Sequence, residues 1–230
     1  MCRIRGRLIL AAALVIGLGA ARPLAAQAPA STAPRPDFTP ADVAFMQGMI
    51  GHHAQAIVMS AMAPTHGASA QLRVLADKIG RSQRDEIELM QNWLRDRGQP
   101  VPDPADPHSM HMAMHGMTGM TGMDMKVMKD MKGRQEMDGH AIALHEMLMP
   151  GMLTAAQLAQ LDSARGPAFD RLYLADMIRH HEGALTMVRT LFDAPRSGQG
   201  AEIFGYATGV DADQRAEIGR MQGMLAAMDQ

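Results

Sequence analysis

Apolar side chains recur every three to four residues over most of the chain, which is the spacing of one helix face. Long helices are predicted at about 39–63, 69–97, 168–192 and 199–227, with a short one at 154–164. Cap residues begin several of them, and proline or glycine follows their ends. No segment of useful length alternates with a period of two. The pattern predicts an all-α fold, a four-helix bundle made of two helical hairpins.

The two predicted hairpins share a sequence pattern. Residues 49–59 (MIGHHAQAIVM) return without a gap as 177–187 (MIRHHEGALTM). Residues 83–90 return in the same way as 214–221. Because the order of the two blocks is kept in both copies, we interpret them as an internal duplication. The duplicated feature is a pair of adjacent histidines with methionines around it.

The pattern divides the chain into five segments. Residues 1–28 have a basic start, a short apolar run and small residues at the end, as a secretory signal peptide does. Residues 29–36 form a Pro-, Ala- and Ser-rich leader, 37–99 the first hairpin, 100–150 an insert and 151–230 the second hairpin. The apolar run is too short for a comfortable membrane span. We therefore expect a periplasmic or secreted protein with no stable membrane anchor once the signal is removed.

Cysteine and charge restrict the function further. The single cysteine, Cys2, precedes the apolar run and would leave with the signal peptide. The mature protein would then have no disulfide, and its stability must come from packing, bound metal or both. Removing the four arginines of the signal changes the formal net charge from −2 to about −6. This negative net charge does not indicate a nucleic-acid partner.

Methionine and histidine crowd the insert. The candidate metal ligands there are His108, Met110, His111, Met112, Met114, His115, Met117, Met120, Met123, His145, Met149 and, just beyond it, Met152. Thioether sulfur is a neutral, soft ligand that favours Cu(I) and Ag(I). In an oxidising compartment these residues bind copper without the disulfide chemistry of cysteine. We expect copper binding, with Cu(I) favoured and Cu(II) or Ag(I) as alternatives; low-complexity drift is the competing interpretation.

The duplicated blocks supply a second set of candidate ligands, which are Met49, His52, His53, Met177, His180 and His181. On a helix, a methionine shares a face with the histidine three or four residues later. The two imidazoles of one pair diverge by about 100°, so they cannot both point at one small site. One is expected to face the bundle interior while the other lies at its flank or bonds to a neighbouring helix. A hydrogen-bonded polar layer without metal is the alternative.

Each histidine pair is expected to lie about a turn from a glutamine and a glutamate on its partner helix. These residues are Gln83 and Glu86 in the first hairpin, and Gln214 and Glu217 in the second. A carboxylate in this place can orient an imidazole, or it can be an ordinary exposed helix residue. Six other methionines are expected to pack in the core: Met46, Met59, Met90, Met187, Met221 and Met224.

Both blocks resemble the DUF305 family. The resemblance rests on FMxxMIxHHxxAIxM at 45–59 and QxxEIxxMxxWL at 83–94, and on FDxxYLxxMIxHHEGA at 169–184 in the second copy. It spans about residues 37–97 and 151–228. It implies a ferritin-like helical bundle, commonly exported, with some members tied to copper binding and resistance. Ala54 stands in the first copy where the second has Glu182, so the two sites need not be equivalent.

Three classes of function remain. The favoured one is an exported copper-binding protein, not an enzyme, that sequesters or chaperones Cu(I) or Ag(I) or confers resistance. Its partners would be metal ions and other periplasmic copper-handling proteins. The second class is a ferritin-like redox enzyme, although the Glu-x-x-His motif of di-iron bundles is absent from this sequence. The third is an envelope-stress adaptor whose methionine-rich surface binds proteins. The oligomeric state stays open.

Overall fold

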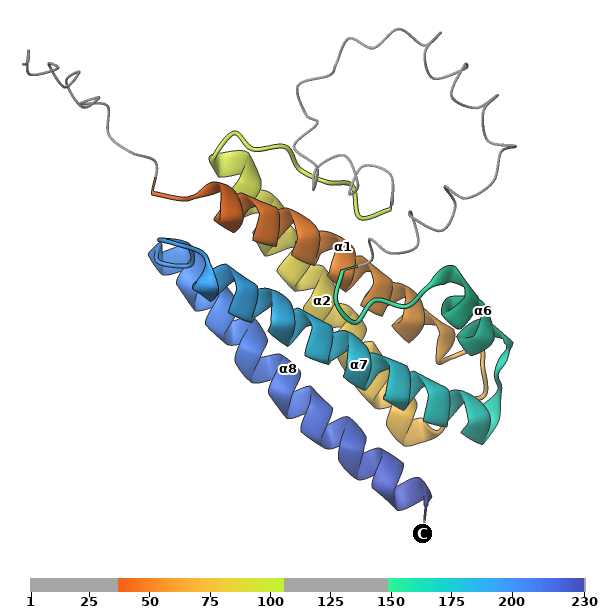
Figure 1. The fold of residues 1–230 in the computed structure, drawn as a ribbon. Coiled ribbons are helices and arrows are strands. Elements are labelled where there is room, and N and C mark those ends of the chain that lie inside the picture. The colour runs from red at the N-terminus through yellow and green to blue at the C-terminus, as the bar shows by residue number, and fades with distance from the viewer. Residues whose placement is uncertain (1–36, 106–148, 230) are drawn as a thin grey trace, which may run out of the picture. The chain divides into compact units, whose positions relative to one another are not determined.

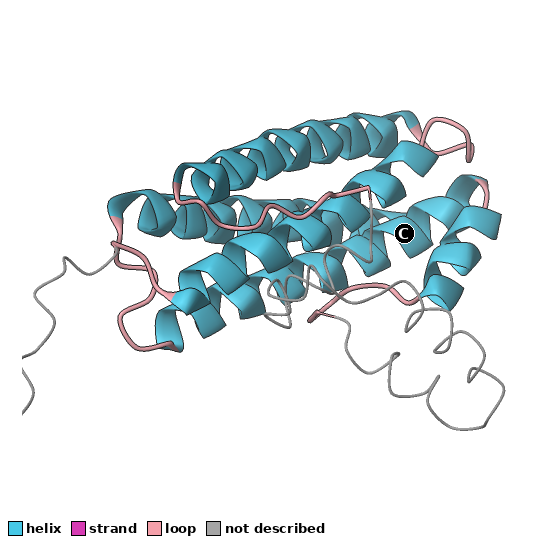
Figure 2. Ribbon diagram, turned by 90° about the horizontal axis from the view of Figure 1, so that it is seen from above, coloured by secondary structure: helices cyan, strands magenta, loops and turns pink. Residues whose placement is uncertain are grey.

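The computed structural model describes residues 37–105 and 149–229. In these residues the chain forms five helices and no strand: α1 (Pro40–Met62), α2 (Ala70–Asp96), α6 (Ala155–Ser163), α7 (Gly166–Asp193) and α8 (Ala201–Met228). Helices α1 and α2 form one antiparallel hairpin, α7 and α8 form the other, and α6 lies beside the end of α1 (Figures 1 and 2). The all-α bundle predicted from the sequence is confirmed. None of the described helices has the length and apolar character needed to cross a membrane.

Local capping chemistry sets the ends of the helices. Thr39 accepts a hydrogen bond from the Asp42 amide, and the Asp42 carboxylate accepts one from the Thr39 amide at 2.7 Å. This capping box satisfies two amides that the helix itself cannot bond. One predicted boundary was wrong, because Gly166 and Pro167 begin α7 rather than precede it. A proline in the first turn has no amide hydrogen to satisfy and is already in a helical φ range.

The two copies make equivalent hydrogen bonds, in which a carboxylate of each hairpin binds the turn of the other. Asp42, at the start of α1, accepts a hydrogen bond from the Gly198 amide in the α7–α8 turn at 2.7 Å. Asp170 is the equivalent residue of the second copy, at the start of α7, and accepts from the Ser69 amide in the α1–α2 turn at 3.2 Å. Each hairpin therefore holds the turn of the other through an equivalent carboxylate, and the two are related by a pseudo-twofold arrangement.

The core consists of two apolar clusters, each built from both hairpins. One contains Met59, Tyr173, Met177 and Met221, and the other contains Phe45, Met46, Met49, Met90 and Val188. Met187 and Met224 are partly buried and pack against these clusters. The packing role predicted for the six other methionines is confirmed.

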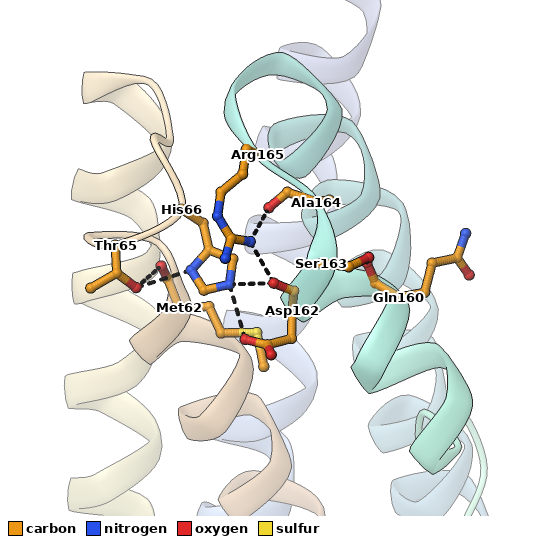
Figure 3. A network of polar contacts seen from close by, with 8 residues as sticks. All are labelled: Met62, Thr65, His66, Gln160, Asp162, Ser163, Ala164 and Arg165. Atoms are coloured by element: carbon orange, nitrogen blue, oxygen red, sulfur yellow. Dashed lines mark hydrogen bonds and ion pairs between the residues drawn. The ribbon is translucent and has the colours of Figure 1, made fainter.

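A buried histidine outside the duplicated motif, His66, fastens the α1–α2 turn to α6 (Figure 3). Its Nδ1 lies 2.9 Å from the Thr65 hydroxyl, and its Nε2 lies 2.9 Å from the Asp162 carbonyl oxygen. Its own carbonyl accepts a hydrogen bond from the Gly166 amide at 2.8 Å. His66 therefore has a structural role, as a polar anchor at the end of the bundle.

Candidate metal centre

The four histidines of the duplicated motif meet inside the bundle. His52 and His53 come from α1, His180 and His181 come from α7, and all four are at most 1% exposed. The ring centroids of His52 and His180 are 3.8 Å apart. Within each adjacent pair the centroids are 6.5 Å and 6.3 Å apart. The fold thus unites two pairs that are far apart in the sequence.

The second histidine of each pair bonds to a carboxylate on the partner helix. His53 Nε2 lies 2.6 Å from Glu86 Oε2, and His181 Nε2 lies 2.9 Å from Glu217 Oε2. Both glutamates are those that the sequence placed near the histidines. Of the two interpretations left open there, the orienting carboxylate is confirmed. The arrangement also confirms that one imidazole of each pair bonds to a neighbouring helix.

The charge of the Glu217 carboxylate is favoured by its neighbours. Burial acts to raise the pKa of this group. The interactions with His181 and with Lys78, whose Nζ lies 3.3 Å away, outweigh burial, so the pKa of Glu217 lies below its ordinary value. The bundle interior therefore holds an ionised carboxylate directly behind an imidazole.

The imidazoles of His52 and His180 are held neutral by burial. Burial, with the nearby His53 ring as the next cause, lowers the pKa of His52 to about 3. Burial also lowers the pKa of His180 well below its ordinary value, with His52 as the next cause. Both rings therefore stay unprotonated throughout the physiological pH range. A neutral imidazole is the form that binds metal ions.

A tight turn closes over this histidine pair. The Met152 amide donates to the Met149 carbonyl at 3.1 Å, and Gly151 has a φ of +78°. With Pro150 in the second position and glycine in the third, these are the features of a type II turn. The Pro150 carbonyl points at α1 and lies 3.0 Å from His52 Nε2.

Two residues at equivalent positions of the repeat seat the turn between α1 and α7. Gln55 on α1 donates to the Leu153 carbonyl at 2.9 Å and accepts from the Leu153 amide at 2.7 Å. On α7 the equivalent residue is Gly183, where a Cβ would lie only 1.9 Å from the Pro150 carbonyl oxygen. The Pro-Gly dipeptide signals a turn in the sequence. Nothing in the sequence, however, shows that the turn packs on Gly183.

Each of the four imidazoles keeps one buried nitrogen without a hydrogen-bond partner. These atoms are Nδ1 of His52, His53 and His181, and Nε2 of His180. Carboxylate and carbonyl oxygens only accept hydrogen bonds, so they place the proton of three of these rings on Nε2. The Nδ1 atoms of these three rings therefore carry a free lone pair. Buried polar atoms without partners are uncommon, and four of them in one place mark these imidazoles as candidate ligands of a metal ion.

The other candidate ligands fall into three groups. Met49 and Met177 are wholly buried, each in a different core cluster, so their ligation stays a prediction. Met149 and Met152 are partly buried at the two ends of the turn. The remaining candidates lie outside the described residues, and these are His108, Met110, His111, Met112, Met114, His115, Met117, Met120, Met123 and His145.

The described residues contain no group of three or more histidine, cysteine or acidic side chains arranged to hold one metal ion. What the described residues offer is imidazole nitrogens and thioether sulfurs. This ligand set suits soft monovalent ions.

The protein is a helical bundle that carries two copies of a paired-histidine motif. The family model of the domain of unknown function DUF305 matches residues 42–142 and again residues 127–225. The chain belongs to the DUF305 family. A search of curated proteins gave no match.

Several solved structures share the fold. A DUF305 fragment from Deinococcus radiodurans is 29% identical, with a TM-score of 0.59 over 84% of this chain and 99% of that one. A DUF305 protein from Streptomyces coelicolor, described as secreted, is 24% identical, with a TM-score of 0.60 over 84% of this chain and 95% of that one. CopM in its Cu(II)-bound form is 25% identical, with a TM-score of 0.53 over 81% of this chain and 96% of that one. CopM has also been solved with Cu(I) and with silver.

Proposed function

We propose that this protein is an exported copper-binding protein that sequesters or chaperones Cu(I), and also Ag(I), with imidazole and thioether ligands. Its task is binding rather than catalysis. The structural likeness to CopM, which has been solved with copper and with silver bound, supports a role in handling these ions. The proposal for this chain rests on its own histidines.

The observation that carries the proposal is the set of four unpartnered, buried imidazole nitrogens. Bonds to Glu86, Glu217 and the Pro150 carbonyl orient three of the rings, so that the other nitrogen of each is available. A metal ion lies about 2 Å from a coordinating imidazole nitrogen.

The electrostatics of the bundle favour a bound cation. A positive charge taken into an apolar interior loses its hydration, which is costly unless an opposite charge lies nearby. The carboxylates of Glu86 and Glu217 lie next to the imidazoles, bonded to His53 and His181. Because His52 and His180 are already neutral, an ion need not displace a proton from either of them.

The methionine- and histidine-rich insert would bind further ions. Its candidate ligands between His108 and Met123 are thioethers and imidazoles spaced a few residues apart. We propose that this segment collects copper in the periplasm or outside the cell and that the bundle holds it. Other copper-handling proteins of the same compartment would be the donors or acceptors.

Replacing His52, His53, His180 and His181 together with glutamine tests the proposal. Glutamine keeps a polar side chain of similar length but lacks the ring nitrogen. Cu(I) titrated against a chromophoric chelator should show fewer tightly bound ions per protein than in the parent. The control is His66→Gln, which changes a buried histidine outside the centre and should leave the number of ions unchanged.

Two results would contradict the proposal. If the fourfold variant binds as many Cu(I) ions as the parent with equal affinity, the histidines form a polar layer with no metal role. If binding falls equally in the His66→Gln variant, the loss reflects damage to the fold. Circular dichroism of both variants should show the helical content of the parent.

A further inference from the structure

Gly48 on α1 leaves space for two methionine side chains. A Cβ placed on Gly48 would lie 3.2 Å from Met149 Sδ and 3.3 Å from Met187 Cε. Met149 begins the turn that covers His52, and Met187 projects from α7. The ends of these two side chains, which come from separate segments of the chain, therefore both lie within 3.3 Å of one point on the α1–α7 face.

The two methionine side chains approach Gly48 one to two helical turns away from the four histidines. Gly48 precedes His52 by four residues on α1, which is one turn on the same face. Met187 follows His180 by seven residues on α7, which is about two turns on the same face. Since His52 and His180 stack on each other, the methionine pair and the imidazoles lie in one row along the interface.

The repeat has no second thioether pair at the equivalent position. The residue equivalent to Met187 in the first copy is Met59, which is wholly buried in the core. The residue equivalent to Gly48 in the second copy is Asp176, whose carboxylate bonds to Arg179. Two thioethers therefore lie beside a glycine at Gly48, but not at the equivalent position of the second copy, which is Asp176. Met149 and Met187, unlike Met59, are only partly buried and remain within reach of an ion from outside.

We propose that Met149 and Met187 form a separate soft-metal site that binds Cu(I) or Ag(I) on the approach to the buried histidines. Two neutral thioethers meeting over a glycine select a soft monovalent ion over Zn²⁺ or a hard cation. Flexible methionine side chains close on an ion with little rearrangement of the backbone. Onward passage of the ion to the imidazoles rests on the proposed function, whereas binding by the thioether pair does not.

Methyl NMR of the full mature chain, labelled with ¹³C at the methionine methyl groups, tests this site. Ag(I) is the probe because it is soft and does not change oxidation state. The Met149→Leu and Met187→Leu variants assign the two resonances. On titration, both resonances should shift together, with the same apparent affinity, while the buried Met59 resonance stays in place. Each single variant should weaken, by about tenfold, the affinity reported by the methyl group of the methionine that remains.

The four-histidine variant separates this inference from the proposed function. In that variant the Met149 and Met187 shifts should persist with similar affinity. If Ag(I) moves these resonances no more than that of Met59, or moves one independently of the other, the site does not exist. Loss of both shifts in the four-histidine variant would also overturn it, because the thioethers would then be responding to ions at the imidazoles. Unchanged Met59 and Met90 resonances in each variant show that its core is intact.

Discussion

Replacing Gly183 with alanine should displace the turn that covers the histidines. The new Cβ would lie 1.9 Å from the Pro150 carbonyl oxygen and 2.4 Å from its carbonyl carbon. Both are backbone atoms, so no side-chain rotation relieves the clash. The turn must move away from α7, and the hydrogen bond between His52 Nε2 and Pro150 breaks.

The structure gives the size of the effect. His52 already has no partner at Nδ1, so losing the Pro150 bond leaves the buried ring with none. An unsatisfied buried polar group costs about 1–3 kcal/mol. Alanine in a helix interior returns about 0.5–1 kcal/mol relative to glycine. The free energy of unfolding should therefore fall by about 1 kcal/mol, and by no more than about 2.5 kcal/mol.

Gly209→Ala is the matched control, because Gly209 lies in the interior of α8 with no atom within 4 Å of an added Cβ. It should stabilise the protein by about 0.5–1 kcal/mol. Urea denaturation of the metal-free proteins measures both effects, and hydrogen exchange of the Met152 and Leu153 amides reports on the turn. If Gly183→Ala is as stable as Gly209→Ala and both amides keep their protection, the turn does not pack on Gly183 as described.

Three other changes have expected outcomes. Burial lowers the pKa of His52 to about 3, so below pH 6.5 this histidine is protonated in the unfolded chain but not in the folded protein. His52 alone should then lower the free energy of unfolding by about 1.4 kcal/mol per pH unit between pH 6.5 and 3, His180 should add to this slope, and the slope should be smaller in His52→Gln. Deleting residues 108–131 should lower the number of Cu(I) or Ag(I) ions measured per protein while helical circular dichroism persists, and an unchanged number would make the insert a mere linker. Tyr173→Phe removes the 2.9 Å bond to the Ser60 hydroxyl and should lower the free energy of unfolding by about 1 kcal/mol in urea denaturation, whereas an unchanged value would refute that contribution.

The fold could be predicted from the sequence because its signals are local or repeated. Thr39 with Asp42, and Thr154 with Gln157, mark helix starts through side chains three residues away. The duplicated blocks then imply two equivalent hairpins, without any knowledge of how they pack. The helix limits therefore differ from the structure only slightly, as at Gly166.

The candidate site was predictable only in part. The adjacent histidines and the glutamates opposite them could be identified, because helical spacing and the hairpin turn relate them. The stacking of His52 on His180 could not, since it depends on how two hairpins that are far apart in the sequence face each other. The roles of the Pro150 carbonyl and Gly183 were also missed, because a backbone oxygen and an absent side chain leave no chemical signature in a sequence.

The most direct test of a copper function is to locate the metal ion. Crystals of the mature protein loaded with Ag(I) would show silver through its anomalous scattering. We predict silver within the bundle, bonded to the unpartnered nitrogens of His52, His53, His180 and His181. Silver found only outside the bundle, with all four imidazoles in the hydrogen bonds of the metal-free protein, would contradict it.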